Sequence, residues 1–298
     1  MRPSNATSRD TWSRSSKRRM TVDEAYLQGL FGLEDKVIVL TGGGGVLCGT
    51  MARGLAKMGA KTAILDISLE AASKVADEIN AEGGESLAVK ADVLSRESLE
   101  ASLQTVLERF GTVDVLINGA GGNAKAATTA PDLAFFDLPE DAFQWVFSLN
   151  FIGTLLPCQV YGKHMAEKGE GNILNIASIN SVRPLTKIPA YSAAKAAVKN
   201  FTEWLAVHIS QNYSPRIRVN ALAPGFYLTT QNRFLLWDEA EDKATPRGQQ
   251  IMSHTPMARF GDPEELMSTV VWLLSPGASF VHGILAIVDG GFQAYSGV

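Results

Sequence analysis

The fold is decided by the stretch Lys36-Val37-Ile38-Val39-Leu40-Thr41-Gly42-Gly43-Gly44-Gly45-Val46-Leu47-Cys48-Gly49. Its first residues form a short apolar run that predicts a buried strand, and the glycine-rich turn after it leads into a helix that extends to about Met58. A second strand is predicted at residues 61–66 and ends in the carboxylate of Asp66. A strand, a short turn, a helix and another strand are typical of a parallel sheet covered on both faces.

The same alternation of strand and helix continues to the end of the chain. Further strands are predicted at residues 86–91, 113–118, 172–176, 217–222 and 284–288, and helices at about 69–82, 95–110, 139–168, 189–211 and 263–274. Residues 226–260 lack a clear period, which favours a lid over a part of the core. We therefore predict one α/β domain over residues 34–298, a doubly wound Rossmann domain with a parallel sheet of about seven strands and helices on both faces.

Composition excludes several classes of protein. The chain has 298 residues, of which 46% are hydrophobic and 19% charged, enough for a large domain with a substantial core. No apolar run approaches the ~20 residues that a membrane helix needs, so we expect no membrane association. The two cysteines and four histidines show neither disulfide nor metal-ligand spacing. We therefore expect no metal site and a location in the reducing cytoplasm.

Charge separates the first 20 residues from the rest. They carry six basic residues and one acidic residue, and because the whole chain has a net charge of −4, residues 21–298 carry −9. An acidic body argues against nucleic-acid binding. We expect residues 1–33 to be a basic, disordered extension with a short lead-in, and Met20 to be the functional start. An organelle transit peptide is the alternative, although no apolar face recurs there at helical spacing.

The glycine-rich turn indicates a dinucleotide site. A strand, a turn without side chains and a helix start bring backbone N–H groups and the positive end of a helix dipole to one point, which suits a pyrophosphate. Asp66, about 20 residues further on, can accept hydrogen bonds from an adenosine ribose. A carboxylate there repels the 2′-phosphate of NADP, so the sequence favours NAD over NADP.

A second group of residues indicates proton transfer. Tyr191 and Lys195 lie one helical turn apart on the same face of a predicted helix, and Ser178 follows a predicted buried strand. The reference pKa of tyrosine is about 10, and a nearby cation favours the phenolate. Taken alone, the Tyr-x-x-x-Lys spacing also fits an ordinary surface pair on a helix.

These residues together resemble the short-chain dehydrogenase/reductase family over about residues 34–298. The family's cofactor turn corresponds to residues 41–48, its Asn-Asn-Ala-Gly motif to residues 118–121, and its Pro-Gly-x-x-x-Thr motif to residues 224–229. Ser178 and Tyr191 have the spacing of the family's catalytic serine and tyrosine. Two departures stand out: Gly119 replaces the second Asn, and Val46 and Cys48 occupy the positions of the second and third turn glycines.

The resemblance implies two sets of site residues. The implied catalytic residues are Asn150, Ser178, Tyr191 and Lys195. The implied cofactor-binding residues are Gly42, Gly45, Val46, Leu47, Asp66, Asp92, Val93, Asn118, Ala120, Gly121, Tyr191, Lys195, Pro224, Gly225 and Thr229.

The family's chemistry implies a role for each catalytic residue. Tyr191 is expected to be the general acid in reduction and the general base in oxidation. Lys195 is expected to lower the pKa of Tyr191 and to hold the nicotinamide ribose. Ser178 is expected to hydrogen-bond the substrate oxygen, and Asn150 to hold a water that links Lys195 to solvent. A non-catalytic NAD-binding regulator is the alternative from another class, and the complete set of four residues argues against it.

Three further segments resemble a sugar-acid branch of the family, the D-mannonate oxidoreductases (fructuronate reductases). They are residues 41–49, 150–157 and 183–191, and residues 230–236 and 294–298 belong to the same likeness. A sugar acid needs a cation for its carboxylate, and Arg183 and Arg233 are the candidates. Its hydroxyls need polar partners, for which the candidates are Asn123, Lys125, Asn180 and Gln231.

Other assignments within the family remain open at this point. A gluconate 5-dehydrogenase or another polyol or sugar dehydrogenase is the main alternative. An acyl-thioester reductase would prefer NADPH, which Asp66 opposes. The resemblance also implies a homotetramer or homodimer, in which the two long helices at about 139–168 and 189–211 form the shared surface.

Overall fold

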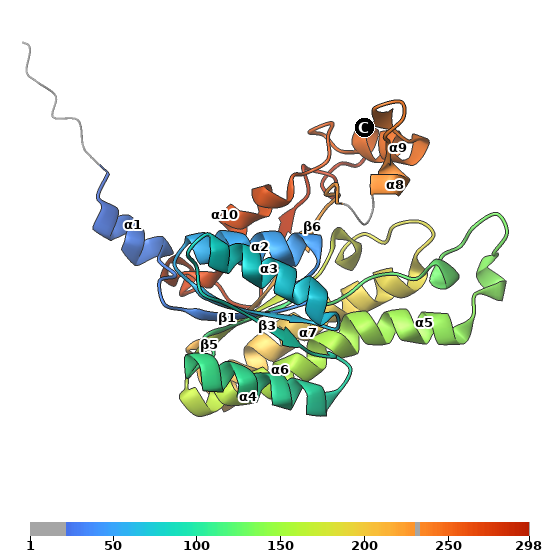
Figure 1. Cartoon of the computed structure of the whole chain (residues 1–298). Helices are drawn as coiled ribbons and strands as arrows, with labels where there is room; N and C mark the ends of the chain where they lie inside the picture. The colour runs from blue at the N-terminus through green and yellow to red at the C-terminus, as the bar shows by residue number, and fades with distance from the viewer. Residues whose placement is uncertain (1–21, 230–232, 298) are drawn as a thin grey trace, which may run out of the picture.

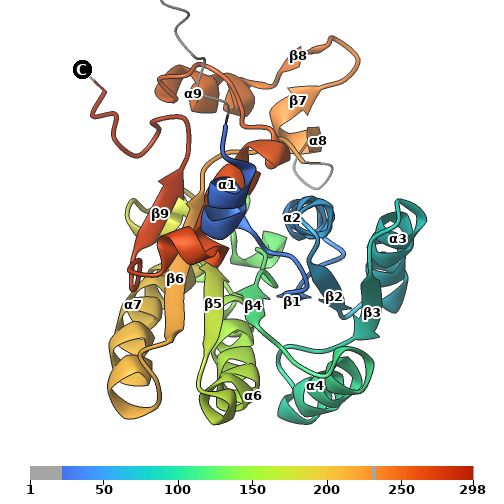
Figure 2. The same ribbon diagram turned by 90° about the vertical axis from the view of Figure 1, so that its left-hand side faces the viewer.

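The structure is a computed structural model that describes residues 22–229 and 233–297. Its centre is a seven-stranded sheet in which every pairing is parallel, in the order β3-β2-β1-β4-β5-β6-β9 (Figure 2). The strands are β1 (Val37–Thr41), β2 (Lys61–Asp66), β3 (Ser86–Lys90), β4 (Val115–Asn118), β5 (Gly171–Ile176), β6 (Ile217–Pro224) and β9 (Leu285–Val288). The predicted single α/β domain with about seven parallel strands is confirmed.

Helices cover both faces of this sheet (Figure 1). They are α2 (Val46–Lys57), α3 (Leu69–Ala81) and α10 (Met267–Leu274) on one face, and α4 (Arg96–Phe110), α6 (Gly153–Lys168) and α7 (Pro189–Asn212) on the other. Strand β1 shows why two layers form. Ile38 and Leu40 belong to the core cluster under α2 and α3, whereas Val37 and Val39 belong to the cluster above α4 and α6. An all-apolar strand buries both faces, as a central parallel strand must.

The expected helix over residues 139–168 is interrupted. The structure has α5 (Glu140–Phe147), then a π-helical turn at Ser148–Ile152, and only then α6. The wide turn ends at Gly153, and Pro157 lacks the N–H that would bond the carbonyl of Gly153 in a regular helix. The prediction of one continuous helix was therefore wrong at this point. Turns of this kind are frequent at functional sites, and this one contains Asn150.

The segment before the first strand contains a helix that the sequence analysis did not predict. Helix α1 (Glu24–Phe31) begins after Asp23, whose side chain accepts a hydrogen bond from the N–H of Tyr26. It lies against the short helix η6 (Pro276–Ala278). Residues 1–21, including the proposed start at Met20, lie outside the described residues.

The predicted lid contains several short elements instead of one irregular loop. They are α8 (Arg233–Leu236), β7 (Trp237–Asp238), β8 (Lys243–Ala244) and α9 (Pro246–His254), with β7 and β8 paired as a small hairpin. Figure 2 shows them above the carboxyl ends of the central strands. A short helix η5 (Pro263–Leu266) then leads into α10. The lid segment therefore lies at the edge of the sheet where a ligand site is expected.

Candidate active site

A cavity of about 760 Å³ opens at the carboxyl ends of β1, β2, β4, β5 and β6. The sheet reverses its strand order between β1 and β4, and ligands of open α/β sheets bind at such a point. Most of the predicted site residues line this cavity: Gly42, Gly45, Val46, Leu47, Asp66, Asp92, Val93, Ala120, Gly121, Ser178, Tyr191, Lys195, Pro224, Gly225 and Thr229. The structure thus gathers residues from positions 42 to 229 into one site.

The glycine-rich turn presents backbone to the cavity. Gly42 has a φ of 63°, a conformation that suits glycine, and a Cβ there would lie 2.8 Å from Cα of Ala120. A Cβ on Gly44 would lie 2.6 Å from Cβ of Ala71. Gly45 is the N-cap of α2 and offers no side chain, so the first turn of the helix faces the cavity through Val46 and Leu47. A helix start preceded by glycines, with its first N–H groups at the cavity, fits a pyrophosphate.

Asp66 is held in a fixed orientation at the end of β2. Its Oδ2 accepts a hydrogen bond from the N–H of Gly44 at 3.1 Å, and its Oδ1 accepts one from the N–H of Ser68 at 3.0 Å. The carboxylate therefore lies beside the turn and lines the cavity. Asp92 is oriented in a similar way, because its Oδ1 accepts from the N–H of Leu94 at 2.9 Å. Both carboxylates retain lone pairs for a ribose or base.

The two departures from the family's motifs explain each other. A Cβ on Gly119 would lie 2.0 Å from Sγ of Cys48, so the thiol fills the space that a side chain at position 119 would need. Cys48 is buried, and burial raises the pKa of its thiol to about 12. The thiol is thus a neutral packing group at neutral pH. Both substitutions are visible in the sequence, but no pattern in it indicates that the two residues are in contact.

Tyr191 and Lys195 converge on the cavity from the first turns of α7. Nζ of Lys195 lies 5.6 Å from the centroid of the Tyr191 ring and donates a hydrogen bond to the carbonyl of Ile176 at 2.7 Å. Only 4% of Lys195 is exposed, and burial lowers the pKa of its ammonium to about 8. Burial raises the pKa of the Tyr191 phenol, and the hydrogen bond with Ser178 opposes this rise. A phenol, an ammonium and a hydroxyl are therefore in reach of one another.

Asn150 lies behind this group, within the π-helical turn. Its Nδ2 donates to the carbonyls of Gly122 at 2.7 Å and Val146 at 2.8 Å, and its Oδ1 accepts from the N–H of Gly122 at 3.2 Å. A Cβ on Gly121 would lie 2.6 Å from Oδ1 of Asn150 and 3.3 Å from Nζ of Lys195. Asn150 thus fixes the glycine loop after β4 beside Lys195. It is fully buried and does not line the cavity.

Asn118 lies below the cavity and does not line it. Its Nδ2 donates to Oδ1 of Asn175 at 2.9 Å and to Sγ of Cys158 at 3.1 Å, which ties β4 to β5 and α6. Among the described residues, its Oδ1 has no hydrogen-bond partner. Asn118 therefore stabilises the carboxyl ends of β4 and β5. Its contact with the cofactor remains a prediction.

The two arginines predicted for a substrate carboxylate have other partners. Nη1 of Arg183 donates to the carbonyl of Tyr295 at 2.8 Å, and Nε of Arg233 donates to Oε1 of Glu239 at 2.9 Å. Neither lines the cavity. The predicted partners of the hydroxyls are also dispersed, since Asn123 donates to Thr128, Asn180 lies next to Ser178, Lys125 is in the short helix Lys125–Ala127, and Gln231 lies outside the described residues.

Residues 22–229 and 233–297 contain neither a metal-binding cluster nor a membrane-spanning helix. No three His, Cys, Asp or Glu side chains there gather in a way that could hold a metal ion. Within the same residues, no helix combines the length and the apolar character needed to cross a membrane.

A profile of the short chain dehydrogenase family matches residues 36–239, which hold the glycine-rich turn, Asp66, Ser178, Tyr191 and Lys195. The chain is a short-chain dehydrogenase. Membership confirms the predicted family and the predicted class of enzyme, an oxidoreductase that acts on CH–OH groups.

Three proteins illustrate where this short-chain dehydrogenase lies within the family. An uncharacterized oxidoreductase of Haemophilus influenzae is 49% identical over 277 residues, which cover 89% of this chain and 96% of that protein. A crystal structure from the same organism, provisionally named a D-mannonate oxidoreductase and containing bound NAD, has a TM-score of 0.84 and 48% identity, and the match covers 91% of this chain and all of that one. The 5-keto-D-gluconate 5-reductase of Escherichia coli is 32% identical over 262 residues, 88% of this chain and 97% of that enzyme.

Proposed function

We propose that this short-chain dehydrogenase uses NAD to interconvert a keto sugar acid and its alcohol, and that the pair is D-fructuronate and D-mannonate. The observation that carries the proposal is the convergence of Ser178, Tyr191 and Lys195 on a cavity that also contains the glycine-rich turn and Asp66. The turn suits a pyrophosphate, and the fixed carboxylate suits the two free hydroxyls of an NAD ribose. The bound NAD in the related Haemophilus structure supports the same choice.

The cofactor, when bound, supplies or accepts the hydride. The residues of the chain transfer the proton and position the substrate and the cofactor. Tyr191 donates its phenolic proton to the carbonyl oxygen during reduction and takes it back during oxidation. Lys195 stabilises the phenolate that remains and donates hydrogen bonds to the nicotinamide ribose, and Ser178 donates a hydrogen bond to the same carbonyl oxygen. Asn150 positions the glycine loop beside Lys195 and holds a water that connects Lys195 with solvent.

The sugar-acid substrate rests on likeness to the provisionally named D-mannonate oxidoreductase and on polar groups near the cavity. A carboxylate needs a cation, and Arg183 and Arg233 lie on the two segments that flank the cavity, the loop before α7 and the lid. Either arginine would have to exchange its present partner for the substrate. Because the carbonyl of Tyr295 is a neutral acceptor and Glu239 is a charged one, Arg183 is the easier of the two to recruit.

A gluconate 5-dehydrogenase is the second candidate, favoured by the likeness to the Escherichia coli 5-keto-D-gluconate 5-reductase. The two proposed keto acids differ only in the configuration of the carbon next to the carboxylate. The hydrogen-bond partners of that single hydroxyl therefore decide between them.

We further propose that the enzyme is a cytoplasmic homotetramer or homodimer. Aromatic rings form a continuous row from Phe147 through Phe151, Phe201 and Trp204 to His208, with centroid separations of 4.7–6.3 Å. Of these, Trp204 is 56% exposed, and the neighbouring Val207 is 57% exposed. Exposed apolar side chains on α7, such as Trp204 and Val207, support a shared surface between copies. Residues 1–20 are proposed to be dispensable for the activity.

The test is a set of initial rates of NADH oxidation with D-fructuronate, D-tagaturonate, 5-keto-D-gluconate and an uncharged ketose, each at matched concentrations. We expect kcat/KM for D-fructuronate to exceed that for the uncharged ketose by at least about a hundredfold, because a paired carboxylate contributes roughly 3 kcal/mol. A higher kcat/KM with 5-keto-D-gluconate would favour the second candidate. Equal values with the uncharged ketose would contradict a sugar-acid enzyme.

A further inference from the structure

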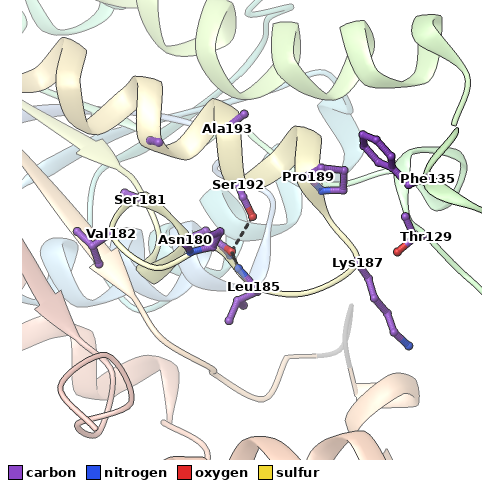
Figure 3. Close-up of a pocket in the computed structure, with 12 residues that line it drawn as sticks. Thr129, Phe135, Asn180, Ser181, Val182, Leu185, Lys187, Pro189, Ser192 and Ala193 are labelled. Atoms are coloured by element: carbon purple, nitrogen blue, oxygen red, sulfur yellow. Dashed lines mark hydrogen bonds between the residues drawn. The ribbon is translucent and has the colours of Figure 1, made fainter. Parts of the chain in front are cut away.

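Asn180 lies between the active-site serine and a second cavity of about 560 Å³. It is the middle residue of the short helix η4 (Ile179–Ser181), and only 5% of it is exposed. Figure 3 shows its side chain beside Ser192, with the hydrogen bond between them, and Leu185 next to it. It is therefore a buried amide that lines the second cavity and contacts Ser178, a residue that lines the first.

The hydrogen bonds of Asn180 fix which end of its amide faces Ser178. The N–H of Leu185 lies 2.9 Å from Oδ1, and a backbone N–H can only donate, so that atom is the oxygen. The Ser192 hydroxyl donates to the same oxygen at 3.0 Å. The amide nitrogen must then point to Oγ of Ser178, which it approaches to 3.3 Å.

This orientation determines the direction of the Ser178 hydroxyl. Oγ of Ser178 accepts from the backbone N–H of Asn180 at 3.2 Å as well as from its Nδ2. Two N–H donors occupy both lone pairs of a hydroxyl oxygen. The proton of Ser178 is therefore left to point away from Asn180, toward Tyr191 and the cavity.

We propose that Asn180 is a positioning residue that makes Ser178 a hydrogen-bond donor to the reacting oxygen, and that it links this direction to the loop before α7 through Leu185. The inference rests on the proposed function, because it assumes that Ser178 donates to a carbonyl oxygen. The alternative is that Asn180 only braces the loop. The two differ in what happens when the donor of the side chain is replaced by an acceptor of the same shape.

Asn180→Asp makes that replacement. When the new carboxyl is ionised it can only accept, so the Ser178 proton turns to it and is lost to the substrate oxygen. When the carboxyl is protonated it donates again, and the original direction returns. We expect kcat for reduction by the variant to be at least about tenfold below wild type at neutral pH. It should recover as the pH falls through the pKa of the carboxyl, an ionisation that the wild-type profile lacks, while the Kd for NADH changes by less than about threefold.

Two controls separate positioning from bracing. Ser192→Ala removes one donor to Oδ1 of Asn180 but leaves Leu185 in place, so kcat should stay within about threefold of wild type, with the wild-type pH profile. In a Ser178→Ala background, Asn180→Asp should have almost no further effect, because the hydroxyl on which it acts is gone. A tenfold loss in that background, or a loss at position 180 that does not vary with pH, would mean that Asn180 only supports the loop.

The series does not depend on the substrate assignment. It runs with whichever keto compound the wild-type enzyme reduces, so a failure of D-fructuronate leaves it intact. An ultraviolet titration of Tyr191, with Tyr191→Phe as the blank, needs no turnover. Because Ser178 would no longer donate to the phenol, Asn180→Asp should raise the pKa of Tyr191 above its wild-type value. An unchanged pKa together with an unchanged kcat would overturn the proposal.

Discussion

At the level of single residues, burial and hydrogen bonding together set the pKa values of the groups in the site. Tyr191 and Lys195 carry opposite potential charges, and burial disfavours the charged form of each. The resemblance to the family implies that Lys195 lowers the pKa of Tyr191. In the structure burial raises the pKa of the phenol, so the expected lowering remains a prediction for the enzyme with its cofactor.

Removing the phenol oxygen of Tyr191 should impair proton transfer and leave NADH binding nearly unchanged. Tyr191→Phe keeps the ring that lies beside Nζ of Lys195 but has no proton to donate. We expect kcat for reduction to fall by about a thousandfold, the scale of general acid catalysis, while NADH binding changes by less than about threefold. Stopped-flow turnover and fluorescence titration measure the two quantities. A variant that retains even a tenth of the wild-type kcat would remove Tyr191 from the mechanism.

The buried ammonium of Lys195 should lower the free energy of unfolding of the protein without cofactor. Its pKa is about 8 in the folded chain and higher in the unfolded chain, where the group is in water, so between these values the unfolded chain binds more protons and stability rises with pH. Lys195→Met should therefore raise the free energy of unfolding at pH 7 by on the order of 2 kcal/mol. The gain should shrink above pH 8, as the wild type loses the buried charge.

Urea unfolding at pH 7 and pH 10 measures this difference. Lys199→Met is a matched control on the same helix, because Lys199 forms a half-exposed pair with Glu203 and should affect unfolding by less than about 1 kcal/mol. A less stable Lys195→Met protein at pH 7 would show that the buried ammonium stabilises the fold.

Among the elements, the glycine-rich turn and the turn after β4 form one unit. The N–H groups of Gly119 and Ala120 donate to Oγ1 of Thr41 at 3.2 and 3.3 Å, so the end of β1 holds the second turn in place. The thiol of Cys48 fills the space beside Gly119. A thiol at this position and a glycine at the other are therefore a matched pair.

A double-mutant cycle tests this pairing. Gly119→Asn should cost about 3 kcal/mol of unfolding free energy, because its Cβ collides with Sγ of Cys48. Cys48→Gly should cost about 2 kcal/mol through a cavity and a more flexible helix start. The double variant, which restores the family's usual residues, should be less destabilised than the sum by at least about 1 kcal/mol. Additive losses in denaturant unfolding would mean that the two positions are independent.

The elements also show what a sequence pattern can and cannot predict. Buried parallel strands consist of apolar runs, so the sheet was predictable from residues such as those of β1. The π-helical turn was not, because Ser148–Ile152 has the composition of an ordinary helix. The geometry of this turn depends on a tertiary contact, because Nδ2 of Asn150 donates a hydrogen bond to the carbonyl of Gly122. Helix α1 was missed because it is short and amphipathic to only a modest degree.

On the scale of the whole molecule, the order of the motifs predicted which residues meet at the strand ends, but it did not predict the partners of the arginines in the loops. Residues that follow parallel strands must meet at one edge of the sheet, so Asp66, Ser178 and Pro224 were bound to lie together. Arg183 and Arg233 obey no such rule, because the partners of a long side chain on a loop depend on which segment lies opposite. In this structure those partners are the chain end at Tyr295 and the lid residue Glu239.

The most direct test of the central claim follows a deuterium atom. The enzyme is incubated with D-fructuronate and NADH that carries deuterium at both C4 positions of the nicotinamide, and the product is examined by NMR and mass spectrometry. We expect D-mannonate with one deuterium on the newly formed carbinol carbon, one NAD formed for each molecule of product, and product formation about a thousandfold slower with Tyr191→Phe. NADH consumption without D-mannonate, or D-mannonate without deuterium from the cofactor, would contradict the proposed function.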